Sequence, residues 1–153
     1  LVVRGADEPV LDAERVLVLD DVKLDRAGQI KPLGGLVERH DGRQGDTLLV
    51  NGDAKAELTM AAGQVERWRI VNASSARYVR LSIGGRPFRI LGTDGGLIER
   101  PVTVTEVLLA TDYRIDIAVG PFNEGQDLAV EALPYARRTI RTACWPGITC
   151  SSK

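Results

Sequence analysis

Hydrophobic and polar residues alternate with a period of two along most of the chain. In VERWRIVN (65–72), Trp68 and Ile70 share one face of the segment, and Arg67 and Arg69 share the other. This alternation is typical of a β-strand that turns one face toward a hydrophobic core. The sequence therefore predicts a strand here whose two large apolar side chains point inward.

Further strands are expected wherever this pattern recurs between turn signals such as Asn51-Gly52 and Gly84-Gly85. RVLVLDD (15–21) is apolar on both faces, which predicts a strand buried on both sides. The other expected strands lie in DTLLVNGD, KAELTM, RYVRLSI, RPFRILG, VTVTEVLLA, YRIDIAVG and DLAVEAL. The positions expected to face inward in RYVRLSI and YRIDIAVG are Val79, Leu81, Ile83, Tyr113, Ile115, Ile117 and Val119.

About eight to ten short strands without a long amphipathic helix predict an all-β Greek-key β-sandwich, formed by a single domain over residues 1–136. Two segments depart from the pattern. Residues 25–46 form the longest irregular stretch, which is either a functional loop or a surface connection. Residues 137–153 lack alternation and contain both cysteines, so we expect an irregular, loosely packed tail.

Composition excludes several partner classes. The chain has 153 residues with 20 basic and 21 acidic side chains, and this balance gives no general case for nucleic acid or an anionic membrane. No apolar run approaches the roughly 20 residues that span a bilayer. No signal peptide is visible, and the chain opens with LVVRGADEP and without methionine, as though it were cut from a longer protein.

The residues that bind metals are few. A blue copper site needs two histidines and a cysteine, often with a methionine, but this chain offers only His40, Met60, Cys144 and Cys150. The spacing of the two cysteines matches no zinc motif, and a surface disulfide or two free thiols is expected instead. Met60 is expected to pack in the core. We therefore predict no metal-binding residue in this chain.

Catalytic residues are equally scarce. A Ser-His-Asp arrangement would have to use His40, which lies among charged residues in VERHDGRQ and is expected to be solvated. No G-x-S-x-G elbow, phosphate-binding loop or dinucleotide fingerprint is present. Asp20 and Asp21 are adjacent in an extended segment and point to opposite faces, so they do not form a glycosidase pair. We predict no catalytic or cofactor-binding residue.

Two polar positions have both a functional and a structural interpretation. Asn72-Ala73-Ser74 fits the N-glycosylation sequence, but a short polar residue after a strand is more often one that caps a turn with its side chain. Asp94 precedes Gly95, which favours a turn over a catalytic acid.

Several linked motifs, in order, resemble the multicopper oxidases, the family of laccases, cuprous oxidases and bilirubin oxidases. They are GDTLLVNG (45–52), GQVERWRIVNASSARYVRLSI (63–83), RILGTDGGLIERPVTV (89–104) and VLLATDYRIDIAV (107–119). The likeness covers residues 1–136. It is most specific to the family's middle domain, which is a plastocyanin-like cupredoxin domain. The chain departs from the family where proline is common near Ala56, and where Thr111-Asp112-Tyr113-Arg114 replaces a Gly-Glu-Arg turn.

The resemblance implies a copper-free middle domain, because the family's copper ligands lie in His-rich motifs of the first and third domains. The parent protein would oxidise phenolic compounds or metal ions, reduce dioxygen to water and work in the periplasm or outside the cell. The expected partners are the flanking cupredoxin domains, with possible self-association of the separate chain. The chain itself would contain no cofactor and catalyse nothing, while the parent would be an enzyme that contains copper.

Two other functions stay open at this point. One is a copper-free cupredoxin-fold protein for periplasmic binding or assembly, without oxidase activity; His-x-His motifs in the flanking gene sequence would favour the oxidase instead. The other is an independent hydrolase that uses His40, Asp94 and Asp116. Alanine substitutions at these three positions that remove no activity would disfavour the hydrolase.

Overall fold

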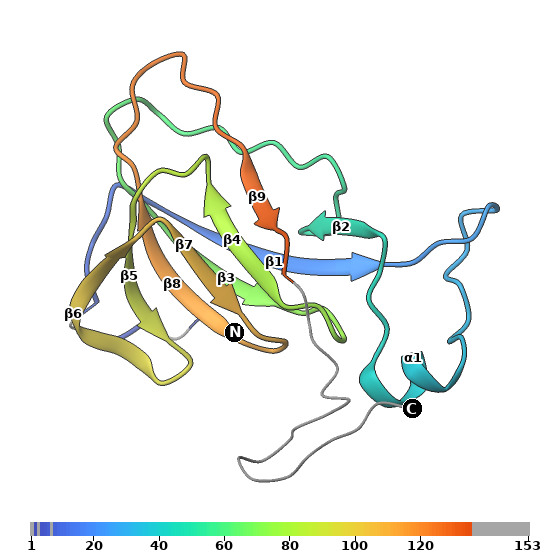
Figure 1. Cartoon of the computed structure of the whole chain (residues 1–153). Coiled ribbons are helices and arrows are strands. Elements are labelled where there is room, and N and C mark those ends of the chain that lie inside the picture. Colours follow the sequence, from blue (N-terminus) through green and yellow to red (C-terminus); the bar gives the residue numbers. More distant parts are fainter. Residues whose placement is uncertain (1, 3, 7, 136–153) are drawn as a thin grey trace, which may run out of the picture.

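The computed structural model describes residues 2, 4–6 and 8–135 of the chain. Over this part the chain forms strands packed in two sheets, with one short helix set apart from them (Figure 1). The predicted boundary at residue 136 and the tail 137–153, with Cys144 and Cys150, lie outside the described residues.

Nine strands form in the described part of the chain, within the expected range. They are β1 (Ala13–Val22), β2 (Thr47–Val50), β3 (Glu66–Asn72), β4 (Val79–Ile83), β5 (Phe88–Thr93), β6 (Gly96–Val104), β7 (Glu106–Leu109), β8 (Arg114–Val119) and β9 (Val130–Leu133). One sheet has six strands in the order β2-β1-β3-β8-β5-β6, and the other has three in the order β7-β4-β9. β1 and β3 run parallel, while every other pair is antiparallel.

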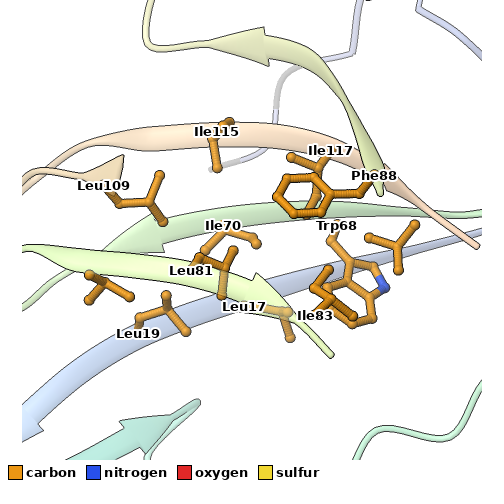
Figure 2. Packing of buried hydrophobic residues seen from close by; sticks show 12 residues of the cluster. Leu17, Leu19, Trp68, Ile70, Leu81, Ile83, Phe88, Leu109, Ile115 and Ile117 are labelled. Carbon is orange, nitrogen blue, oxygen red and sulfur yellow. The ribbon is translucent and has the colours of Figure 1, made fainter. Parts of the chain in front are cut away.

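The core lies between the two sheets and contains the side chains that the alternation placed there (Figure 2). Trp68, Ile70 and Leu81 are each 2% exposed, and Ile117 is fully buried. Burying large apolar side chains is the main favourable term in folding, at about 25 cal/mol per Å². The register predicted for the strands in VERWRIVN, RYVRLSI and YRIDIAVG is confirmed.

Two strand predictions were wrong in part. Leu17 and Leu19 of β1 are buried, but Val16 on its other face is 47% exposed, so this strand is covered on one side rather than two. KAELTM forms no strand. Met60 does pack against the core, as expected, and so does Leu58, although no neighbouring strand completes a hydrogen-bonded ladder with this segment.

The expected irregular segment is more ordered than its sequence suggests. Leu24 and Ile30 form an isolated antiparallel bridge. In the turn between them, the Asp25 carboxylate accepts hydrogen bonds from the backbone N–H groups of Ala27 and Gln29. The helix α1 (Leu36–Asp41) follows, and none of its residues is buried. We call residues 23–41 the arm, since they stand out from the sandwich in Figure 1. No helix among the described residues has the length and hydrophobicity to cross a membrane.

Candidate functional site

A groove of about 860 Å³ lies among the described residues. One wall is the irregular segment that contains Leu58 and Met60, and the other is residues 122–132, which include β9. Its floor reaches core side chains of β1, β3 and β4, among them Trp68 and Leu81. β9 is an edge strand, so the groove runs beside a strand that has a neighbour, β4, on one side only.

The groove's rim is acidic. The carboxylates that line it belong to Asp20, Asp53, Glu57, Glu124, Asp127 and Glu131, whereas Lys55 is the single basic residue among the lining residues. An apolar floor with charged edges can hold an apolar or amphipathic group, and the excess of carboxylates favours a cationic one. No serine, histidine or cysteine is among the residues that line it.

The three residues of the hydrolase hypothesis are not brought together. His40 lies on the arm with its side chain 89% exposed, and its Nδ1 is 2.6 Å from Asp41 Oδ1. Asp94 lies in the turn between β5 and β6 and accepts a hydrogen bond from Arg114. Asp116 lies on β8, paired with two arginines of β3. Each side chain therefore has its own partner on a different part of the fold.

A cluster of ion pairs covers the outer face of the six-stranded sheet, and sequence reasoning missed it. Arg67 is 3% exposed and donates to Glu8 and Asp116, while Arg69 donates to Glu8, Glu14 and Asp116. Glu8 lies in the segment before β1, so these pairs bind that segment to β3. The alternation had placed both arginines on this face but could not show that the preceding chain covers them.

A second buried charge lies at the start of β3. The Glu66 side chain is 2% exposed, and its carboxylate accepts hydrogen bonds from Arg15 and, at 2.9 Å, from the Trp68 indole N–H. The hydrogen bond from Arg15 lowers the pKa of Glu66 below its ordinary value of 4.5, although burial opposes this shift. Arg15 also donates to the backbone carbonyl of Thr59, which ties β1 to the groove wall.

Asn72 acts as the predicted structural cap. The residue is fully buried, and its amide nitrogen donates to the backbone carbonyls of Arg77, Leu109 and Ala110 at 2.7–3.1 Å. Its Oδ1 accepts from the Ser74 hydroxyl at 2.6 Å. The amide that a glycan would need is therefore buried and engaged in the folded chain, and the turn-capping interpretation is confirmed.

The sequence and the two-sheet fold of this chain match those of a known protein family. The family model for multicopper oxidases matches residues 24–132. The chain belongs to the multicopper oxidase family. Its two-sheet architecture is that of the cupredoxin-fold domains of these oxidases, as in a multicopper oxidase from Campylobacter jejuni described as a metallo-oxidase, with a TM-score of 0.72 and 34% identity. That likeness covers 87% of this chain and 27% of the other.

Other relatives give the same result. A multicopper oxidase from Pseudomonas thermotolerans has a TM-score of 0.74 at 30% identity, covering 82% of this chain and 31% of that one. Cell division protein FtsP of Xenorhabdus nematophila is 40% identical over 106 residues, 67% of this chain and 21% of that protein. Multicopper oxidase mco of Staphylococcus aureus is 36% identical over 80 residues, 52% of this chain and 18% of that protein. The chain thus spans less than a third of each of these relatives.

The residues present do not fit the copper that the family name implies. No group of three His, Cys, Asp or Glu side chains with the spacing of a metal site occurs among the described residues. The only histidine of the chain is on the solvated arm, while Met60 packs against the core and its methyl group lies close to Gly120. The prediction that the whole chain binds no copper stays a prediction, since Cys144 and Cys150 lie outside the described residues.

Proposed function

We propose that this chain is the copper-free middle domain of a longer multicopper-oxidase-family protein, where it spaces two flanking cupredoxin domains. The observation that carries the proposal is the combination of a family match over residues 24–132 with a single, solvated histidine. A domain that held copper in this family would need several imidazole ligands in one place. The domain's contribution would be mechanical and steric, and the longer protein would carry out the oxidation.

The exposed apolar side chains of the arm support contact with a flanking domain. Leu36 is 85% exposed, Val37 and Ile30 are each 66% exposed, and Leu33 is 54% exposed. The arm nevertheless has a defined shape, since Lys23 pairs with Glu38 at 2.7 Å across its base. Contiguous exposed apolar surface commonly marks an interaction site. An ordered segment with no residue in the core cluster and five exposed aliphatic side chains, of which Leu24 at 40% is the fifth, fits a surface that another domain covers.

The complete open reading frame tests the position of the domain. We expect His-x-His motifs both before and after the region that this chain represents. The longer protein, purified after growth with copper, should hold several copper ions and oxidise a phenolic substrate with consumption of dioxygen. The 153-residue chain, treated identically, should be colourless and bind copper only weakly. A tightly held stoichiometric copper with strong absorption near about 600 nm in the short chain, the signature of copper bound to a cysteine thiolate, would contradict the proposal.

The second candidate is a family member without oxidase activity that serves in assembly. Cell division protein FtsP from six bacteria, among them Photorhabdus laumondii and Proteus mirabilis, is 33–40% identical to this chain over the aligned residues. Loss of the His-x-His motifs from the flanking sequence, with no copper in the purified longer protein, would favour this candidate. Either function places the longer protein in the periplasm or outside the cell, which a fusion of its natural N-terminus to alkaline phosphatase would test.

A further inference from the structure

Two aliphatic side chains of the groove lie on the inward faces of their strands but are not buried. Val130 of β9 is paired with the buried Ile83 of β4, and residues directly opposite each other in an antiparallel pair share a face. Leu48 of β2 lies two residues before Val50, which packs against the core, so these two side chains also share a face. Nevertheless, Val130 is 40% exposed and Leu48 is 42% exposed, and both line the groove. The described part of the chain therefore leaves apolar surface uncovered at a place where a sandwich normally buries it.

The backbone of β9 adds hydrogen-bonding groups to this apolar surface. β9 (Val130–Leu133) pairs with β4 along one side, and the described residues supply no strand along its other side. In an antiparallel strand the N–H and C=O groups of successive residues point to opposite sides, so those of every second residue in β9 point away from β4. A free edge of this kind is a template for a further strand. The ligand that fits this edge is therefore an extended peptide, which places alternate side chains over the apolar floor.

The carboxylates around the groove set the charge of that peptide. Glu57 on one wall and Glu124, Asp127 and Glu131 on the other are exposed, and they take part in none of the ion pairs found among the described residues. In contrast, the carboxylates in the cluster on the outer face of the six-stranded sheet are all paired with arginines. Lys55 is the single basic residue that lines the groove. Because these negative charges are not neutralised by neighbouring side chains, they attract a cationic segment.

We propose that the groove binds an extended, basic segment of a partner protein, which adds a strand to β9. The alternate apolar side chains of this segment lie over the floor near Val130 and Leu48. Its lysine or arginine side chains lie on its other face, where Glu131 of β9 is a cross-strand neighbour, since Glu131 and Val130 point to opposite faces. This inference goes beyond the function proposed above, because neither a spacing role nor an assembly role requires this groove to bind a peptide.

The probe is a synthetic peptide in which lysine and valine alternate and both termini are blocked. Titrated into the isotope-labelled 153-residue chain, it should bind saturably, with the largest changes in the nuclear magnetic resonance signals of backbone amides at Val130–Leu133. One control peptide has glutamate in place of lysine, and another has the same lysines and valines in two separate blocks. Both should bind several-fold more weakly, because the first reverses the charge and the second loses the alternation.

Charge reversal on the rim supplies matched variants of the chain. Glu131→Lys, in β9, should weaken binding of the alternating peptide several-fold. Glu99→Lys changes the net charge equally at an exposed position on β6, in the other sheet, and should leave the affinity unchanged. Glu124→Lys, at an exposed position in the turn before β9, repeats the test if Glu131→Lys alters the far-ultraviolet circular dichroism.

The longer protein tests whether the groove is open to a partner. By isothermal titration calorimetry, it should bind the alternating peptide with an affinity similar to that of the 153-residue chain, whatever its copper content, which tests the proposed function separately. Failure of the peptide to bind either protein would overturn the inference, as would equal binding of the three peptides or equal effects of Glu131→Lys and Glu99→Lys. Signals of β9 that shift with the concentration of the chain alone would also overturn it, because a second copy would then occupy the groove.

Discussion

At the scale of single residues, Trp68 is a large aromatic side chain buried in the core between the two sheets. It is 2% exposed, and its indole N–H donates to Glu66, so neither its ring nor its polar atom contacts bulk water. Trp68→Ala would leave a cavity and should lower the free energy of unfolding by about 3–5 kcal/mol, the range for a buried aromatic residue. Urea denaturation followed by circular dichroism measures this.

A surface position supplies the control for that measurement. Val10 is 95% exposed, and Val10→Ala should change the free energy of unfolding by no more than about 0.5 kcal/mol. If Trp68→Ala were as mild as Val10→Ala, the face of β3 assigned to the core would be wrong, since a slip of one residue exchanges the two faces.

The lowered pKa of Glu66 predicts how the stability of the chain depends on pH. Its folded pKa is lowered, chiefly by the hydrogen bond from Arg15, so the unfolded chain takes up a proton at higher pH than the folded chain does. The stabilisation by Glu66 is therefore fully present above the ordinary pKa of 4.5 and is lost as the pH falls below 4.5 and through the lowered folded value. Stability measured in urea from pH 7 to pH 3 should fall in this window.

Substituting Glu66 by glutamine removes the carboxylate and shows how much of the loss of stability in acid is due to this residue. Glu66→Gln should be less stable than the unmodified chain at pH 7, and its stability should decline less steeply below pH 4.5. Glu106→Gln is the matched control, because Glu106 also pairs with an arginine, Arg80, but is 42% exposed. A steep acid dependence that survives in Glu66→Gln and disappears in Glu106→Gln would contradict the assignment.

At the scale of the elements, Asn72 ties three strands together. Its amide donates to one carbonyl group just before β4 and to two at the end of β7, so the end of β3 is fixed to both strands. Asn72→Ala would leave buried carbonyl groups without a donor, and each unsatisfied buried group costs about 1–3 kcal/mol. We expect a loss of stability of at least that size, measured by urea denaturation, while Asn123→Ala on an exposed loop should have little effect. Equal costs at the two positions would contradict a linking role for Asn72.

Which elements the sequence could predict depends on how local their causes are. Alternation set the inward face of β3, β4 and β8 because burial of every second side chain acts within a single strand. It failed for KAELTM, since a strand also needs a partner at hydrogen-bonding distance, which no local pattern reveals. Alternation also overestimated how far the second face of β1 is buried. Val16 on that face is as apolar as its neighbours, yet it is 47% exposed. The burial of Arg67 depends on Glu8, 59 residues away, and was likewise beyond a local pattern.

The candidate site was still harder to predict. The groove exists because β9 ends one sheet while a separate, irregular segment forms the facing wall, and that juxtaposition is a property of the topology. The single histidine predicts that this chain alone cannot supply the several imidazole ligands of a copper site, and this stays a prediction. Motif order then identified the family, which the match over residues 24–132 confirms.

At the scale of the whole molecule, the sandwich and the arm differ in how far their apolar side chains are buried. The sandwich encloses its core between two sheets, but the arm presents Leu36 and Val37 to water and contributes no residue to the core. Within a longer protein, another domain could cover these side chains. In the separate chain, the same side chains are available to a second copy, since burial of apolar surface is favourable in either case.

We therefore expect the 153-residue chain to self-associate through the arm at high concentration. Sedimentation velocity over a range of concentrations should show a species heavier than the monomer, which Leu36→Ser/Val37→Ser should shift back toward the monomer. Both side chains are exposed and belong to a short helix outside the core, so the double variant should fold as the unmodified chain does. Val10→Ser, an equally exposed aliphatic position outside the arm, should leave the distribution unchanged. If the unmodified chain stays monomeric at every concentration, or if Val10→Ser disperses the assembly as well as the double variant does, the arm is not the surface that another domain covers.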